Sequence, residues 1–183
     1  MPSGPSLGLL ELESLARGVL VADVLVKKAA VQIVRAEAVS PGKYLLIFLG
    51  SVADVEESFN AGVEAAGSTL IDRLILPHVA EAVRDALVTP PNRASTASIG
   101  IVELHTVAAT LRAADLCLKK AQVRLTQFEL AIGIGGKGWF MICGEQHDVE
   151  AALEAVVLST EANLLVGTEL IQQPHHEIRG PIV

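Results

Sequence analysis

The stretch LGLLELESLARGVLVADVLVKKAAVQIVRAEAV, residues 7–39, decides the fold because the chain contains a second version of it. Residues 99–131 read IGIVELHTVAATLRAADLCLKKAQVRLTQFELA and align with residues 7–39 at an offset of 92 positions. The alignment matches Gly8 with Gly100, Glu11 with Glu103, Ala22-Asp23 with Ala114-Asp115, and Lys27-Lys28-Ala29 with Lys119-Lys120-Ala121. Self-similarity at a fixed spacing indicates a repeated structural unit, so we expect two domains of the same fold.

The repeat continues past a glycine-rich loop and extends to the end of each half. Beyond that loop the offset becomes 94, which matches Gly42-Lys43 with Gly136-Lys137, Gly50 with Gly144, and Asp54-Val55-Glu56 with Asp148-Val149-Glu150. The second copy has therefore gained two residues inside the loop, and Pro77-His78 later matches Pro174-His175. The intervening VTPPNRASTAS is rich in Pro, Ser and Thr, which is typical of a linker. The sequence predicts a first domain at 1–88, a linker at 89–98 and a second domain at 99–183.

Each copy shows the same order of secondary-structure signals. A short apolar strand is followed by a helix from about Leu15 to Ala29, or from Val107 to Ala121, with Lys near its C-terminal end, where the helix dipole favours positive charge. Alternating apolar residues predict a second strand, the loop leads to a third, and a second helix begins near Val52 or Gln146 before a fourth strand. This β-α-β-β-α-β order predicts an α+β protein with two tandem ferredoxin-like (split βαβ) domains, each a four-stranded antiparallel sheet with both helices on one face.

Composition excludes several classes of function. The chain is 51% hydrophobic and only 3% aromatic, with a net charge of −7, whereas nucleic-acid-binding proteins normally show a basic patch and stacking aromatic residues. The sequence has no run near the roughly 18 apolar residues of a membrane-spanning helix, and its start lacks the basic residues of a secretory signal. We therefore expect a cytoplasmic protein that hides excess apolar surface in an oligomer, with Cys117 and Cys143 as reduced core thiols.

The segment AIGIGGKGWF, residues 131–140, contains Gly133, Gly135 and Gly138 in the G-x-G-x-x-G spacing of a dinucleotide-binding turn. That turn holds a pyrophosphate at the N-terminus of a following helix. Here the loop leads instead into WFMICG, a short apolar and aromatic segment that predicts a strand. The context therefore argues against a nucleotide site, and the glycines need another explanation.

Gly-x-x-Glu in the opening strand and Ala-Asp-x-x-x-Lys in the Ala-rich helix resemble the opening of a bacterial microcompartment shell domain. The resemblance covers nearly the whole chain, twice and in unpermuted order. Among these domains, the chain is most similar to the tandem-domain trimer class of the propanediol-utilisation type. The resemblance implies a structural protein and not an enzyme. Three chains would form a pseudohexagonal tile with a central pore for metabolites, and tiles would join other shell proteins in the shell of the microcompartment.

The resemblance also implies roles for individual residues. It places the loop between the second and third strands at the tile's symmetry axis, so the pore-lining residues are Ser40, Pro41, Gly42, Gly133, Ile134, Gly135 and Gly136. Loops crowded around an axis need small side chains and unusual backbone angles, which glycine supplies. It also places Lys27 and Lys119 at the edges where tiles meet, whereas a solvated lysine that complements the helix dipole is the alternative.

One position departs from the family pattern. Relatives of the propanediol type have Cys before Pro-Gly-Lys, and three such thiolates hold an iron–sulfur cluster in the pore, whereas this chain has Ser40. Serine is a poor ligand here because these clusters are normally held by cysteine thiolates. We therefore expect no cofactor and no bound metal, and an open pore ringed by three Ser40 hydroxyls.

Other residues could carry chemistry but lack partners in the sequence. Glu11 and Glu103 end strands as catalytic carboxylates often do, yet no nucleophile or metal ligand accompanies them, so we expect structural, hydrogen-bonded side chains and no catalytic residues. His78, His175 and His176 follow Pro at the end of each copy and fit capping or surface roles. Two alternatives stay open: a small-molecule-sensing regulatory domain, because ferredoxin-like repeats also bind metabolites at interfaces, and a shell protein with a metal or redox site in its pore.

Overall fold

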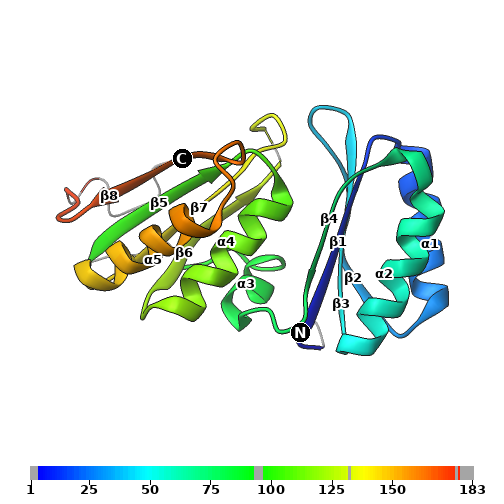
Figure 1. The fold of residues 1–183 in the computed structure, drawn as a ribbon, viewed down its shortest axis with the longest axis horizontal. Helices are drawn as coiled ribbons and strands as arrows, with labels where there is room; N and C mark the ends of the chain where they lie inside the picture. Colours follow the sequence, from blue (N-terminus) through cyan, green and yellow to red (C-terminus); the bar gives the residue numbers. More distant parts are fainter. Residues whose placement is uncertain (1–3, 93–96, 132, 176, 178–183) are drawn as a thin grey trace. The chain divides into compact units, whose positions relative to one another are not determined.

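The computed structural model describes residues 4–92, 97–131, 133–175 and 177, and its two compact units divide between Val79 and Ala80 (Figure 1). The elements of the first unit are β1 (Ser6–Leu12), α1 (Leu15–Lys28), β2 (Gln32–Val39), β3 (Lys43–Gly50), α2 (Val52–Ala66), a short 3-10 turn (Gly67–Thr69) and β4 (Leu70–Leu76). Those of the second unit are α3 (Glu81–Ala86), β5 (Ser98–Leu104), α4 (Val107–Lys120), β6 (Arg124–Leu130), β7 (Gly138–Gly144), α5 (Gln146–Ser159) and β8 (Leu165–Ile171).

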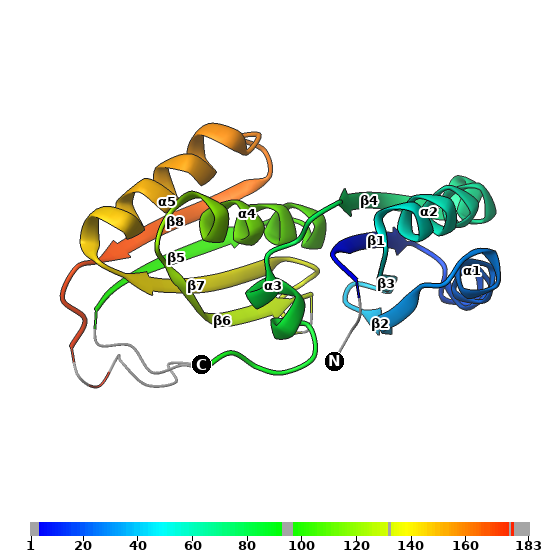
Figure 2. The ribbon, with the colours of Figure 1, turned by 90° about the horizontal axis from the view of Figure 1, so that it is seen from below.

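Both units contain the predicted sheet. The strand order is β2-β3-β1-β4 in the first unit and β6-β7-β5-β8 in the second, and every neighbouring pair is antiparallel. Within each unit the two long helices lie on one face of the sheet, α1 and α2 in the first and α4 and α5 in the second (Figures 1 and 2). The predicted tandem ferredoxin-like fold is therefore confirmed.

Capping residues explain where the first helix of each copy begins. The side chain of Ser14 accepts from the backbone N–H of Arg17 at 3.2 Å, and that of Thr106 accepts from Ala109 at 3.1 Å. Such a cap satisfies one of the unpaired N–H groups at a helix start and is worth about 1 kcal/mol. Each helix then ends with two lysines at its negative end, as the repeated Lys-Lys pair predicts.

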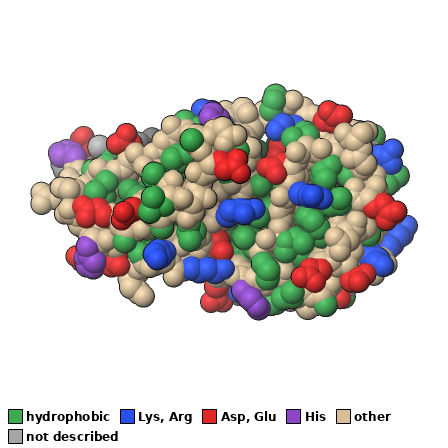
Figure 3. Space-filling view, viewed as in Figure 1, with side chains coloured by type: hydrophobic (Ala, Val, Ile, Leu, Met, Phe, Trp, Pro, Cys, Tyr) green, Lys and Arg blue, Asp and Glu red, His purple; other side chains and the backbone are tan. Residues whose placement is uncertain are grey.

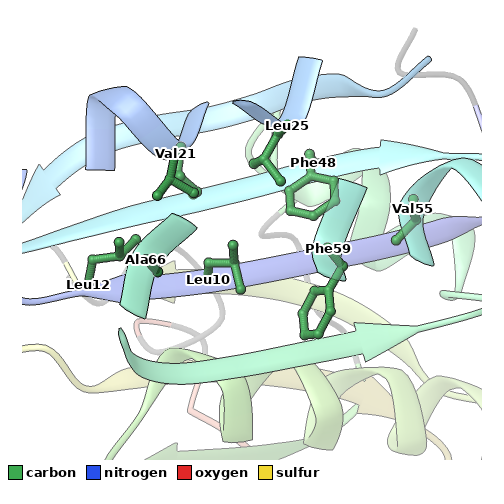
Figure 4. Close-up of a cluster of buried hydrophobic side chains, with 9 residues drawn as sticks. Leu10, Leu12, Val21, Leu25, Phe48, Val55, Phe59 and Ala66 are labelled. Carbon is green, nitrogen blue, oxygen red and sulfur yellow. The ribbon is translucent and has the colours of Figure 1, made fainter. Parts of the chain in front are cut away.

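The core of the first unit lies between its helices and its sheet. Leu10 and Leu12 of β1 and Phe48 of β3 belong to one buried cluster with Leu25 of α1 and Phe59 of α2 (Figure 4), and each of the five is at most 8% exposed. Burying one such side chain stabilises the fold by roughly 1.5–3 kcal/mol. This layer holds β2 and β3 in place and so fixes the position of the loop between them.

The segment that follows β4 belongs to the second compact unit, although the sequence assigned residues up to 88 to the first domain. This segment forms α3, which was not predicted and which contacts α4 and β6. The backbone N–H of Ala80 donates to Oδ1 of Asp115 at 2.7 Å. The predicted linker 89–98 ends where β5 begins at Ser98, and its residues 93–96 lie outside the described part of the chain.

In the described ranges, no helix is both long enough and apolar enough to cross a membrane. Positive and negative side chains are interspersed on the face shown in Figure 3, and no purely basic area stands out on that face.

Candidate functional site: the two glycine loops

The first glycine loop is a three-residue turn that joins β2 to β3. Ser40, Pro41 and Gly42 are exposed, and the Ser40–Pro41 peptide bond is cis. The backbone N–H of Gly42 donates to the carbonyl oxygen of Val39 at 3.0 Å, which closes a turn with cis-proline at its third position, as in type VI turns. Gly42 has a φ of 82°, in the left-handed region that favours glycine. The turn therefore presents one hydroxyl and one rigid ring at the end of the hairpin.

The second glycine loop joins β6 to β7 and is longer. The N–H of Ala131 donates to the carbonyl of Lys137 at 2.8 Å, and the N–H of Lys137 donates to the carbonyl of Ile134 at 3.3 Å. Ile132, also predicted to belong to this loop, lies outside the described residues. The backbone φ is positive at three glycines: Gly133 (72°), Gly135 (66°) and Gly136 (82°). These angles explain why the loop is rich in glycine, since other residues adopt them only at an energetic cost.

The two loops end in the same way where they enter the next strand, as the repeat alignment predicts. Gly42 and its counterpart Gly136 share the same φ of 82°. The next residue in each copy is a lysine whose Nζ lies 2.9 Å from Oε1 of a strand glutamate, Lys43 with Glu11 and Lys137 with Glu103. Each glutamate thus holds the lysine that follows the loop, which is a structural role.

The environments of these two ion pairs differ. The Glu11 side chain is 1% exposed, and among the described residues neither of its oxygens has a well-directed hydrogen bond, so Lys43 is its charge partner. The Glu103 side chain is 42% exposed and accepts a hydrogen bond from Lys137. Removing one partner of a buried pair costs far more than removing one partner of an exposed pair. The prediction of a hydrogen-bonded glutamate therefore holds for Glu103, whereas Glu11 is ion-paired only.

Packing explains the third glycine of the G-x-G-x-x-G pattern. Gly138 is the first residue of β7, and a Cβ there would lie 2.8 Å from Cβ of Thr110 on α4. In the first copy the arrangement is reversed, because Tyr44 stands at the strand position and Gly18 at the helix position, where a Cβ would lie 2.5 Å from Cγ of Tyr44. Each copy has one side chain and one glycine at this contact. Gly138 therefore makes room for Thr110, and the element that follows the loop is a strand with no helix N-terminus to bind phosphate.

The two predicted edge lysines lie on separate helices, α1 and α4. Nζ of Lys27 is 2.6 Å from Oδ2 of Asp23, and Nζ of Lys119 is 2.7 Å from Oδ2 of Asp115. Both are pairs four residues apart on one helix, which contribute little to stability when exposed. The Lys27 side chain is 72% exposed and that of Lys119 is 47% exposed, so both can reach a neighbouring molecule.

The described residues do not fit an iron–sulfur cluster or another metal. Cys117 and Cys143 are buried, in α4 and β7, and burial raises the pKa of Cys117 to about 12, which keeps it a thiol. The loop position that would need a thiolate carries the hydroxyl of Ser40. Within the described ranges, no group of three or more His, Cys, Asp and Glu side chains could hold a metal ion. The prediction that both cysteines are buried thiols is confirmed.

Comparison with known proteins gives the same repeat and identifies it. The family model of the BMC domain matches this chain twice, at residues 6–79 and 98–174. The chain belongs to the BMC-domain family. It is 34% identical to the bacterial microcompartment shell protein PduT of Citrobacter freundii, over 94% of this chain and 95% of that protein. It also resembles the crystal structure of a microcompartment protein from Desulfitobacterium hafniense, with a TM-score of 0.87 and 36% identity over 97% and 99% of the two chains.

A more distant relative matches nearly the whole of this chain. The carboxysome assembly protein CcmO of Synechocystis sp. is 28% identical over 97% of this chain, which spans 59% of that protein. With both BMC domains matched, the chain is a bacterial microcompartment shell protein, and its predicted location in the microcompartment shell is confirmed. The BMC family is one of structural shell proteins.

The sequence located the loops but missed what holds them. The alignment had already matched Glu11 with Glu103 and Lys43 with Lys137, yet nothing in it indicated that the glutamate and the lysine of one copy touch. The strand register explains the contact in the first copy: Glu11 of β1 pairs with Leu45 of β3, and Lys43 lies two residues from Leu45, so its side chain is on the same face of the sheet as that of Glu11. Ala131, with a φ of 62°, is a second feature that the sequence did not reveal.

Proposed function

We propose that three copies of this shell protein close into a pseudohexagonal tile with six BMC domains around a threefold axis. The observation that carries the proposal is a difference in exposure between helices that are equivalent in the repeat. On α1, Leu15 is 45% and Val19 is 60% exposed, whereas their counterparts on α4, Val107 and Leu111, are fully buried. An apolar helix face left in water favours association, at roughly 25 cal/mol for each Å² of apolar surface that is buried.

The sheets differ in the opposite sense. On the first sheet Leu9 is fully buried and the Glu11 side chain is 1% exposed. Their counterparts on the second sheet, Ile101 and Glu103, are partly exposed. The first unit thus has an exposed apolar helix face, and the second unit has a partly exposed sheet face. Head-to-tail association brings these unlike faces together. It forms a closed ring when the rotation from one subunit to the next divides evenly into a full turn. Three chains of two domains each would give a ring of six domains.

The glycine loops would then surround the axis. A threefold axis repeats each loop three times, so Ser40, Pro41 and Gly42 alternate with the Gly133–Gly136 turn around one opening. The side chains there are small or polar, apart from Ile134. We propose that this opening carries small polar metabolites across the shell, with the Ser40 hydroxyls as hydrogen-bonding groups and no bound metal or cofactor.

The outer rim would join tiles to one another and to other shell proteins. Lys27 and Lys119 occupy equivalent positions at the helix ends and project from the surface, held by Asp23 and Asp115. Each such contact is worth about 1 kcal/mol or less, but a tile carries six of these lysines and an extended array multiplies the effect.

Electron microscopy of the overproduced protein tests the tile. We expect flat sheets or tubes built from hexagonally arranged units. The proposal would be contradicted by dispersed particles of single-chain size under all conditions of salt and concentration.

A further inference from the structure

The second unit carries the chain's single tryptophan on the sheet face that turns away from its helices. Trp139 of β7 pairs with Glu103 of β5, so their side chains lie on the same face. A Cβ at the preceding Gly138 would meet Thr110 of α4, and successive strand residues alternate between faces, so Trp139 points away from α4. Trp139, Ile101 and Glu103 are all partly exposed, and we call these three residues the Trp139 face.

The equivalent face of the first unit is covered. At the position of Trp139 the first unit has Leu45, which is fully buried, and the Glu11 side chain opposite it is 1% exposed. The same ion pair of glutamate and lysine therefore exists in a covered form, with Lys43, and in an open form, with Lys137. The open form belongs to a face that lacks its cover.

Helix α1 has the complementary feature, an apolar flank left in water. The Val19 flank consists of Leu15 and Val19, and Val19 is 60% exposed, whereas its counterpart on α4, Leu111, is fully buried. The next residue, Leu20, points about 100° away around the helix and is 46% exposed, but its counterpart Arg112 is exposed as well. The repeat thus distinguishes the side of α1 that is covered in the second copy from the side that stays in water.

We propose that the Val19 flank of one copy packs on the Trp139 face of a neighbouring copy, with Trp139 as its anchor, and covers the Glu103–Lys137 ion pair. The occupant is a second copy of this chain, because the counterparts of both surfaces are buried and a chain with one open surface of each kind associates head to tail. Tryptophan is among the residues that contribute most to interfaces. The inference rests on the proposed trimer and names the contact that closes it.

The same contact reaches the second glycine loop through Lys137. The carbonyl of Lys137 accepts from the N–H of Ala131 at 2.8 Å, and its own N–H donates to the carbonyl of Ile134 at 3.3 Å. Its side chain lies 2.9 Å from Glu103. In the single chain this ion pair is partly exposed and contributes little, whereas a covering helix turns it into a buried pair. Association thus fixes the residue whose backbone closes the loop.

Two adjacent substitutions on α1 test the contact. Val19→Arg puts a charge into the contact and should convert the trimer to single chains, as measured by light scattering. Leu20→Arg is the matched control, because it places the same side chain on the same helix where the second copy already has Arg112, and it should leave the trimer intact. Circular dichroism should show that both variants stay folded, since both positions are exposed.

Trp139 reports on the contact from the other side, because it is the only tryptophan of the chain. In the parent and in Leu20→Arg, its emission should lie at a shorter wavelength and be less quenched by acrylamide than in Val19→Arg. Trp139→Arg should also give single chains. Mixing it with Val19→Arg should restore association and shift the emission back, because one variant keeps the Val19 flank and the other keeps the Trp139 face.

Glu103→Gln tests the covered ion pair. Breaking a buried pair leaves an uncompensated charge, so the concentration at which the trimer dissociates should rise by at least about tenfold. In the single-chain Val19→Arg background, Glu103→Gln should leave the urea midpoint of unfolding nearly unchanged. Glu11→Gln in that background should lower the midpoint, because the Glu11 side chain is already buried within one chain.

The outcomes separate this inference from the proposed trimer. If the parent is trimeric and Val19→Arg is also trimeric, with the emission of Trp139 unchanged, the contact is wrong and the trimer stands. The same holds if Glu103→Gln leaves the dissociation concentration unchanged. Should Val19→Arg fail to fold, the parent decides, because a trimer in which acrylamide quenches Trp139 as readily as free tryptophan overturns the contact. A parent that stays a single chain overturns both proposals.

Discussion

The exchange of glycine and side chain between the two repeats makes a quantitative prediction. In the first copy Gly18 of α1 faces Tyr44 of β3, and in the second Thr110 of α4 faces Gly138 of β7. A Cβ at Gly18 would lie 2.5 Å from Cγ and 2.9 Å from Cβ of Tyr44. These atoms lie next to the backbone, so rotation of the ring does not relieve the clash.

The expected magnitudes follow from that geometry. Gly18→Thr gains a few tenths of a kcal/mol in helix propensity but overpacks the contact, which costs about 1–3 kcal/mol or more. Tyr44→Gly removes a half-buried ring and costs about 2–3 kcal/mol, which is less than the roughly 3–5 kcal/mol for truncating a fully buried aromatic side chain. The double variant recreates the Thr110 and Gly138 contact of the second copy. We therefore expect the double variant to be about 1–3 kcal/mol more stable than it would be if the two single effects added. This is the scale of coupling measured between residues in contact.

Urea unfolding of the parent, both single variants and the double variant gives the coupling energy. Each variant is followed by circular dichroism at the same protein concentration, so that association contributes equally. Additive effects, within about 0.5 kcal/mol, would refute the explanation of Gly138 as a packing residue.

Three further predictions concern the rim, the pore and the core. Lys27→Ala together with Lys119→Ala should reduce sheet formation seen by electron microscopy while leaving the trimer intact, and sheets as abundant as the parent's would rule out the rim assignment. The parent should purify colourless, whereas Ser40→Cys should bind an iron–sulfur cluster or a soft metal at about one site per trimer, because thiolate is a far better ligand than hydroxyl. Metal analysis and visible absorbance measure both, and a cluster in the parent would contradict the prediction. Burial raises the pKa of Cys117 from 9.0 to about 12 in the folded protein, so the unfolded chain loses this proton at a lower pH. The free energy of unfolding should therefore fall as the pH rises from about 9 toward 12, by up to about 1.4 kcal/mol per pH unit. Cys117→Ala lacks this thiol, so only the parent should lose this contribution, and the unfolding free energies of the two proteins should converge as the pH rises across that range.

The helices and strands that repeat were the part that sequence could predict. Two copies of one pattern gave two independent chances to recognise each element, and the predicted starts at Val52 and Gln146 coincide with those of α2 and α5. Both first helices begin after a Ser or Thr cap and end at Lys-Lys, which are local signals that need no knowledge of the tertiary fold.

The parts that depend on contacts between distant segments were not predictable in this way. Helix α3 has six residues and no long apolar period, and it is held by contacts with α4 and β6 and by the Ala80 to Asp115 hydrogen bond, which joins residues 35 positions apart. Short helices are unstable alone, so their formation depends on packing. The role of Gly138 also depends on a contact between distant segments. Its missing side chain makes room for Thr110, which lies 28 positions earlier in the chain, so the sequence did not indicate this packing role.

The molar mass in solution tests the central claim most directly. Multi-angle light scattering on the parent at micromolar concentration should return three times the chain's 19.2 kDa, which is about 58 kDa, for a particle that does not change mass on moderate dilution. A stable species of 19.2 kDa, with the apolar face of α1 left in water, would contradict the threefold tile and the pore that depends on it.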